Sequence, residues 1–81
     1  MGKTVQVNYF ALFREKRGLK SEQCSTKAAT LSEFYEELSA RYGFGLAIQN
    51  LRVARNNEFC DWDSSFEAGD EIVFIPPVAG G

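Results

Sequence analysis

The 81-residue sequence predicts a single α+β domain. Three observations point to this class. One segment shows the periodicity of an amphipathic helix, and the segments before and after it show strand patterns. The final strand is apolar on both faces, which is typical of a strand inside a sheet. A chain of this length buries only about 60–65% of the surface that its unfolded form exposes, so it has little room for a deep pocket.

Residues 4–13, TVQVNYFALF, predict the first strand, because valine and aromatic residues are enriched there. One face of this strand would hold Val5, Val7, Tyr9, Ala11 and Phe13. Residues 14–18, REKRG, predict a turn that ends at the glycine, and residues 19–26 predict a second, antiparallel strand. The chain would therefore start with a hairpin.

Residues 30–43, TLSEFYEELSARYG, predict the main helix. Thr30 and Glu33 form a capping-box pattern, in which each side chain accepts a hydrogen bond from an amide at the helix start. Gly43 supplies the left-handed residue that ends the helix. Apolar residues recur at helical spacing and form one stripe, at Leu31, Phe34, Tyr35, Leu38 and Tyr42. One apolar stripe needs one sheet to cover it.

The strands that follow the helix complete the sheet. Residues 51–55 predict a strand, Asn56-Asn57 a turn, since asparagine tolerates positive φ, and residues 58–62 a short return strand. Residues 71–75, EIVFI, predict the central strand. Pairing this strand parallel to the first, with the helix across one face, gives a β-grasp, or ubiquitin-like, roll: a mixed sheet of about five strands. We expect residues 1–75 to form this domain and residues 76–81 to form a flexible tail that ends in two glycines.

Composition argues against several classes of function. The formal net charge is −2, unlike the basic surface of a nucleic-acid-binding protein. The chain has no histidine, which is the commonest general base and metal ligand, and its two cysteines lack the spacing of a zinc site. We therefore expect no metal site, no nucleic-acid partner and no catalytic machinery of its own.

Location is predicted from two further absences in the sequence. No apolar run approaches the roughly 20 residues that cross a bilayer, and no signal peptide is recognised. We expect a cytoplasmic protein with no membrane partner and with reduced cysteines. Cys24 and Cys60 have no predicted role.

The sheet face that the helix leaves uncovered should be polar, yet the sequence predicts apolar residues on it. The candidates are Phe10, Leu12, Phe59 and one of the pairs Ile72/Phe74 or Val73/Ile75. A patch of this kind on a small protein marks a partner surface. The alternative is a sheet that curls enough to bury these side chains against loops.

The last eight residues, FIPPVAGG, predict an accessible chain end. Pro76 and Pro77 cannot donate ladder hydrogen bonds, so they end the sheet and hold an extended path. Gly80 and Gly81 have no Cβ, so their backbone can pass through a narrow channel. The segment that would insert into another protein is Pro76, Pro77, Val78, Ala79 and Gly80. The α-carboxylate of Gly81 would then be the reactive group.

Residues 69–81, GDEIVFIPPVAGG, resemble the C-terminal signature of the family of molybdopterin synthase small subunits, which are ubiquitin-like sulfur carriers ending in PPVxGG. The segments VNYFALFREKRG and ARNNEF are also similar to that family, so the resemblance covers the whole chain. The Gly-Gly end alone is less specific, because other ubiquitin-like proteins share it. The preceding Pro-Pro-Val favours the molybdenum-cofactor branch.

The resemblance implies a mechanism and a set of partners. An E1-like adenylyltransferase would use ATP and Mg²⁺ to form an acyl-adenylate on Gly81, and a sulfur-donor protein would convert it to a thiocarboxylate. The tail would then enter the large catalytic subunit of molybdopterin synthase, in a heterotetramer, and deliver sulfur to cyclic pyranopterin monophosphate. The chain itself would hold no cofactor stably. The candidate contacts with the large subunit are Phe10, Arg14, Phe59, Phe74 and Ile75.

Three other functions stay open on the sequence. The chain could be a related ubiquitin-like sulfur carrier for thiamine synthesis or tRNA thiolation. It could be a protein modifier that is joined through Gly81 to lysines of other proteins. It could also be a plain interaction domain in which the two terminal glycines have no chemical role.

Overall fold

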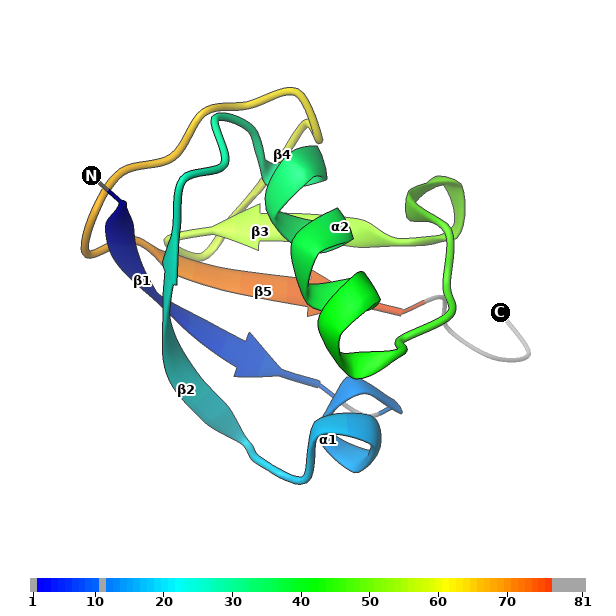
Figure 1. The fold of residues 1–81 in the computed structure, drawn as a ribbon. Coiled ribbons are helices and arrows are strands. Elements are labelled where there is room, and N and C mark those ends of the chain that lie inside the picture. Colours follow the sequence, from blue (N-terminus) through cyan, green and yellow to red (C-terminus); the bar gives the residue numbers. More distant parts are fainter. Residues whose placement is uncertain (1, 11, 77–81) are drawn as a thin grey trace.

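The computed structural model describes residues 2–10 and 12–76. In chain order its elements are β1 (Lys3–Tyr9), α1 (Leu12–Arg17), β2 (Ser21–Thr26), α2 (Leu31–Tyr42), the 3₁₀ turn η1 (Ile48–Asn50), β3 (Arg52–Arg55), β4 (Glu58–Cys60) and β5 (Glu71–Ile75). Figure 1 shows one layer of sheet with α2 lying across a single face of it. The predicted α+β class is therefore confirmed.

The five strands form one sheet in the order β2-β1-β5-β3-β4. β5 lies at the centre, parallel to β1 and antiparallel to β3, while the two outer pairs are antiparallel. This topology is the predicted β-grasp roll, and the central place of β5 explains why both of its faces are apolar. The turn between β3 and β4 is made by Asn56 and Asn57, at φ of 53° and 72°, as the sequence predicts. β4 ends at Cys60, two residues before the predicted end of that strand.

The caps of α2 match the sequence prediction. The Glu33 amide donates to Thr30 Oγ1 at 3.3 Å, and the Ala29 amide donates to Glu33 Oε1 at 2.8 Å. At the other end Gly43 adopts φ 68° and its amide donates to the Ser39 carbonyl. The stripe residues Leu31, Phe34, Tyr35 and Leu38 are buried against the sheet, and Tyr42 packs at the margin of the core. The buried stripe and the two caps therefore define the same helix, with the bounds that the sequence predicts.

The predicted first strand is too long. β1 ends at Tyr9, and the chain from Leu12 to Arg17 is the short helix α1 instead of a strand and a turn. Phe13 explains the change, because its side chain is fully buried and its ring lies edge-on to Phe44 at 4.9 Å. A turn of helix brings this ring into the end of the core, between the sheet and α2. Gly18 then ends α1 at φ 77°, with its amide donating to the Arg14 carbonyl at 2.8 Å.

Candidate partner surface

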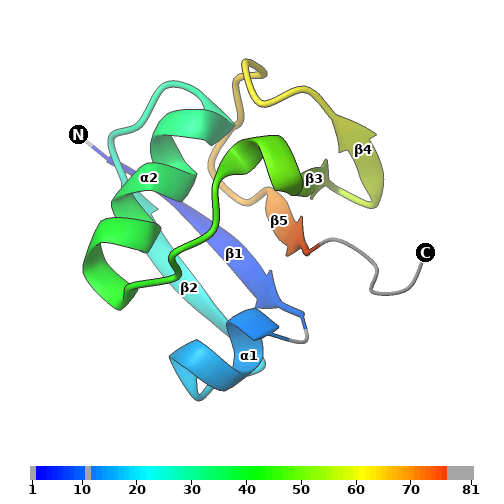
Figure 2. The ribbon, with the colours of Figure 1, turned by 90° about the vertical axis from the view of Figure 1, so that its right-hand side faces the viewer.

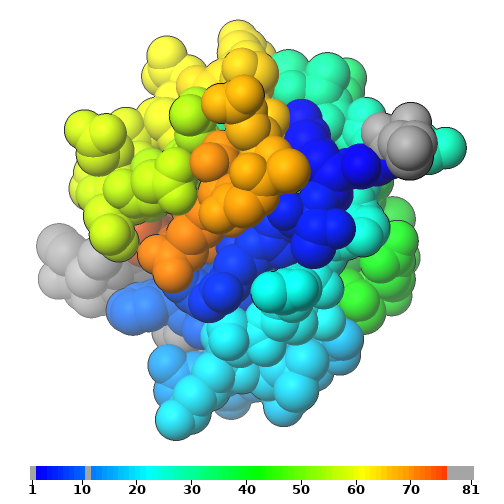
Figure 3. Space-filling view, turned by 90° about the vertical axis from the view of Figure 1, so that its left-hand side faces the viewer, coloured from blue at the N-terminus to red at the C-terminus, as the bar shows by residue number. Residues whose placement is uncertain are grey.

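The sheet face opposite α2 is polar on one side and apolar on the other. Register places Asn8, Val73, Ala54 and Phe59 in one row across β1, β5, β3 and β4 on this face. In Figure 3 the cyan, blue, orange and yellow-green segments lie side by side in the order of the sheet. The polar side is formed by β1 and β2, where Thr4 and Gln6 face solvent. The apolar side lies over β5, β3 and β4.

Two large aromatic side chains stand out from the described surface. Phe10 is 53% exposed and Phe59 is 61% exposed, as the sequence predicts for a partner surface. Val73 and Ile75 of β5, both half-buried, lie on the same face of the sheet as Phe59. Leu12 begins α1 and is half-buried, because the alternation that places it on this face ends with β1. Phe10, Phe59, Val73 and Ile75 are called the apolar patch below.

The prediction that Phe74 belongs to this surface is wrong. Its side chain is 0% exposed, and its ring packs among aromatic rings of the core. The ring centres of Tyr35 and Trp62 lie 5.2 and 5.9 Å away. Phe74 shares a face with Ile72, so Val73 and Ile75 point the other way. Glu71, the one polar residue of this strand, is the signal that could have shown this, because residues i, i+2 and i+4 share a face.

The chain leaves the sheet beside the apolar patch. β5 ends at Ile75, and Pro76, which has no amide proton, follows it. Figure 2 shows this end of β5 between α1 on one side and the β3–β4 hairpin on the other. Pro76 is half-buried. The other residues predicted for tail insertion, Pro77, Val78, Ala79 and Gly80, and the predicted reactive residue Gly81 lie outside the described part of the chain.

Two exposed arginines are candidates for polar contacts at the apolar patch. Arg14, the predicted flanking contact, lies on α1 four residues after Phe10. Arg52, which the sequence prediction missed, begins β3 opposite Ile75, and its guanidinium carbon lies 4.3 Å from the centre of the Phe59 ring. The sequence alone gives little indication of this position, because only the strand register brings Arg52 next to Ile75 and Phe59.

A network of polar side chains connects β1, β2 and α1. Glu22 on β2 accepts hydrogen bonds from Tyr9 Oη at 2.6 Å and from Arg17 Nε and Nη2 at 2.7 and 2.8 Å. The guanidinium of Arg17 also lies over the ring of Tyr42 at 4.2 Å. The hydrogen bonds from Arg17 and then Tyr9 outweigh burial and hold the pKa of Glu22 below its usual range. One carboxylate therefore joins β1, β2 and α1, and Arg17 extends the contact to α2.

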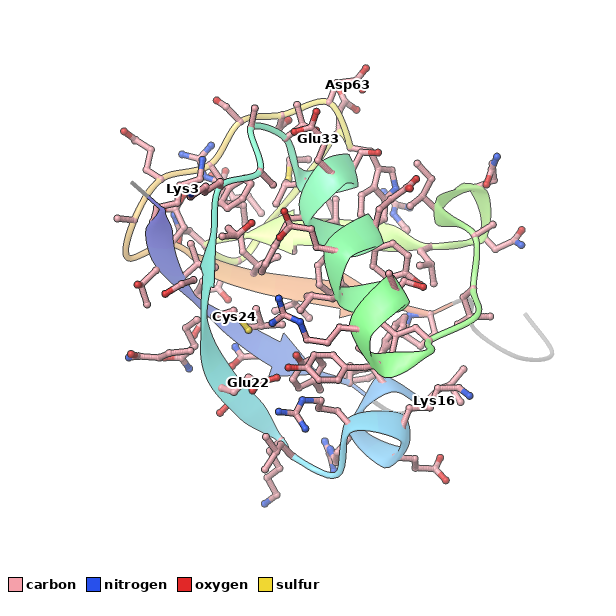
Figure 4. All side chains as sticks on the ribbon, viewed as in Figure 1. Lys3, Lys16, Glu22, Cys24, Glu33 and Asp63 are labelled. Carbon is pink, nitrogen blue, oxygen red and sulfur yellow. The ribbon has the colours of Figure 1, made fainter. Side chains whose placement is uncertain are left out.

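The two cysteines, for which the sequence predicts no role, lie on different strands of the sheet. Figure 4 labels Cys24 and Glu22 on β2, the strand at one edge of the sheet. Cys24 is buried and Cys60 half-buried; both are free thiols, and burial raises the pKa of each. Within residues 2–10 and 12–76, no three metal-ligating side chains come together. Over the same residues no helix is long and apolar enough to cross a membrane.

Comparison with solved structures supports the fold. SAMP1 of Haloferax volcanii superimposes with a TM-score of 0.78, at 24% identity and covering 96% of this chain and 99% of that one. The second comparison is with a chain in the complex of subunits 1 and 2 of the molybdopterin-converting factor of Helicobacter pylori. It has a TM-score of 0.62 at 28% identity, and covers 96% of this chain and 99% of that one. The β-grasp topology is thus shared with ubiquitin-like proteins.

Comparison with curated proteins gives relatives of nearly the same length. The chain is 34% identical over 80 residues to the molybdopterin synthase sulfur carrier subunit of Haemophilus influenzae, with 95% of this chain and 99% of the relative covered. It is 29% identical over 80 residues to the protein of the same name from Escherichia coli, with the same coverage. A family model described as the ThiS family matches residues 7–81, and with these relatives it shows that the chain belongs to the ThiS family.

Proposed function

We propose that this chain is the sulfur carrier subunit of a molybdopterin synthase. The observation that carries the proposal is the nearly full-length similarity to two proteins of that name, from Haemophilus influenzae and Escherichia coli. The Pro-Pro-Val-Ala-Gly-Gly end of the sequence supports it, because this end has the form of the sulfur carriers it resembles. The chain acts as a carrier and not as a catalyst on its own.

The reaction takes place at the α-carboxylate of Gly81. An E1-like adenylyltransferase transfers AMP from ATP, with Mg²⁺, to this carboxylate and releases pyrophosphate. Sulfur at the sulfide level, supplied by a sulfur-donor protein, then attacks the acyl carbon and displaces AMP, which leaves a thiocarboxylate in place of the carboxylate. In the synthase this thiocarboxylate gives its sulfur to cyclic pyranopterin monophosphate. Two such transfers build the dithiolene of molybdopterin, and in each the acyl group left on the carrier is hydrolysed by water to an ordinary carboxylate. The ATP and Mg²⁺ belong to the activating enzyme, and the reactions take place in the cytoplasm.

The large catalytic subunit is the partner of the apolar patch and of Arg14. The complex of subunits 1 and 2 from Helicobacter pylori supports a partner of this kind. Docking on the patch would place β5 and Pro76 against the large subunit, so that residues 76–80 lead from the contact into its active site. The patch positions the carrier, and the tail delivers the reactive group.

Mass spectrometry of the intact chain tests this function. The purified protein is incubated with its activating enzyme, ATP, Mg²⁺ and a sulfur donor. We expect a mass change that matches replacement of one oxygen by sulfur, localised to Gly81 by fragmentation. The variant lacking Gly81 is the control, and should remain folded but take up no sulfur.

The same experiment separates the alternatives. Isopeptide adducts between Gly81 and lysines of other proteins, with no sulfur exchange, would support a protein modifier. A sulfur-loaded chain that fails to convert cyclic pyranopterin monophosphate with the large subunit would support a carrier for another thiolation pathway.

A further inference from the structure

We propose that Arg52 is a specificity-determining residue of the apolar patch, and that it binds a carboxylate on the large subunit of the synthase. The inference rests on the proposed function, because it names the chemistry that the partner must present to this surface. Three observations support it: the position of the Arg52 guanidinium over the Phe59 ring, the absence of an ion pair to Arg52 among the described residues, and the apolar side chains beside it.

The strand register and the stack fix the position of Arg52. Arg52 lies directly opposite Ile75 in the β3–β5 ladder, so both side chains leave the sheet on the face away from α2. The guanidinium carbon lies 4.3 Å from the centre of the Phe59 ring. The cation therefore lies over the ring of Phe59, and the side chain of Arg52 is exposed on the open surface.

Arg52 differs in its partners from Arg17 and Arg55. Arg17 Nε pairs with Glu22 at 2.7 Å, and Arg55 Nε pairs with Asp70 at 2.9 Å. Within the described residues Arg52 forms no ion pair, and its guanidinium lies over the Phe59 ring. Its N–H donors are therefore available to a partner.

The surroundings of Arg52 determine which partner group fits. A protein that covers Phe59, Val73 and Ile75 removes water from the guanidinium as well. A desolvated guanidinium without an acceptor is costly, whereas a carboxylate forms a bidentate pair with it. One fixed cation in an apolar surface suits a single acidic side chain. A nucleic acid would need a row of cations, and the net charge of −2 argues against it. Arg52 would thus favour a partner with an acid at this point and reject one without it.

Calorimetric titration with the purified large subunit tests the inference. The chains compared are the unaltered protein, Arg52→Glu, Arg52→Met and Lys27→Glu. Lys27 is exposed between β2 and α2, away from the patch, and its substitution changes the net charge by the same amount as Arg52→Glu. We expect Arg52→Glu to weaken binding at least about tenfold at low salt and Lys27→Glu to change it less than about twofold. Arg52→Met, which keeps an apolar stem on Phe59, should lie between them and should flatten the salt dependence.

A second arm identifies the acid. Individual Asp→Lys and Glu→Lys variants of the large subunit are titrated with Arg52→Glu, and one of them should restore most of the lost affinity. Equal binding by Arg52→Glu and Lys27→Glu would overturn the inference and leave the proposed function standing. Failure of the unaltered chain to bind the large subunit would overturn both. The unfolding temperature of each variant, expected to match that of the unaltered chain, shows that a loss of binding is not a loss of fold.

Discussion

At the scale of single residues, Glu22 shows how one side chain positions several elements. Its carboxylate accepts three hydrogen bonds from β1 and α1, and its side chain is 16% exposed. Arg17, which donates two of them, is the last residue of α1. The position of α1 relative to β1 therefore depends on this carboxylate. Phe10, which precedes α1 and accepts a hydrogen bond from the Phe13 amide at 3.1 Å, depends on it indirectly.

We expect Glu22→Gln to destabilise the fold by about 1–2 kcal/mol at neutral pH, because it removes the charged acceptor of these hydrogen bonds. The pKa of Glu22 is lowered in the folded chain, so its contribution is complete above the usual pKa of glutamate. It disappears as the pH falls through the lower pKa of the folded state. Urea unfolding at a series of pH values from neutral into acid should therefore show the difference in stability between the two proteins shrinking as the pH falls below the usual pKa of glutamate. Glu36→Gln, at an exposed position of α2, is the control and should change little at any pH.

The sequence predicted surface exposure correctly for residues whose exposure does not depend on which strands pair. The exposure of Phe10 and Phe59 was predicted because each is a large apolar residue at the end of a strand or next to a hairpin turn. Phe74 was misplaced because its strand is apolar on both faces, and only Glu71 distinguishes them. Arg52 was missed because its neighbours Phe59 and Ile75 come from two other strands. The sequence cannot bring these residues together without the register.

At the scale of elements, α2 was predicted almost to the residue and α1 was not predicted at all. The twelve residues of α2 show the full helical period and a cap at each end. The six residues of α1 are too short for a period, and Phe13 alone ties them to the core. The unused signal was Gly18 after Arg14, Lys16 and Arg17, since basic residues followed by glycine are typical of a helix C-terminus.

Leu38 tests the packing of α2. It is 1% exposed in the stripe that faces the sheet, so Leu38→Ala should leave a cavity and cost about 2–5 kcal/mol of unfolding free energy. Glu36→Ala on the solvent side of the same helix should stay within about 0.5 kcal/mol. Urea titration followed by circular dichroism measures both. A loss of unfolding free energy below about 1 kcal/mol for Leu38→Ala would contradict the packing of α2 against the sheet.

Gly43 tests the end of the same helix. A Cβ at this position would meet no atom within 4 Å, so any cost of Gly43→Ala comes from the backbone at φ 68°. We expect about 1–2 kcal/mol of destabilisation. Gly43→Asn should cost less, because asparagine adopts the left-handed conformation more readily than alanine. Equal losses in the two variants would contradict a backbone origin.

At the scale of the whole molecule, the fold depends on its last strand. β5 pairs on both edges, with β1 and with β3, and Ile72 and Phe74 are buried in the core between sheet and helix. Removing β5 therefore splits the sheet and opens the core together. The segment that leads to the proposed reactive end is also a central structural element.

Two truncations test this dependence. A chain that ends at Pro76 retains every contact described above, and should unfold at the same urea concentration as the full chain. A chain that ends at Asp70 lacks β5, and should show no cooperative unfolding transition. Far-ultraviolet circular dichroism during urea titration distinguishes the two. Marked destabilisation of the chain that ends at Pro76 would contradict the predicted division between domain and tail.

The central place of β5 also has a mechanical consequence. A partner protein that binds the chain beyond Pro76 and pulls on it applies a force along the axis of β5. The ladder hydrogen bonds to β1 and β3 run across that axis, on both edges of the strand. The load is therefore shared in shear by two ladders at once, whereas a strand at the sheet margin could be peeled away one bond at a time. A pulling force on the tail is thus resisted by two strand pairings at once, so the sheet resists unfolding under that force.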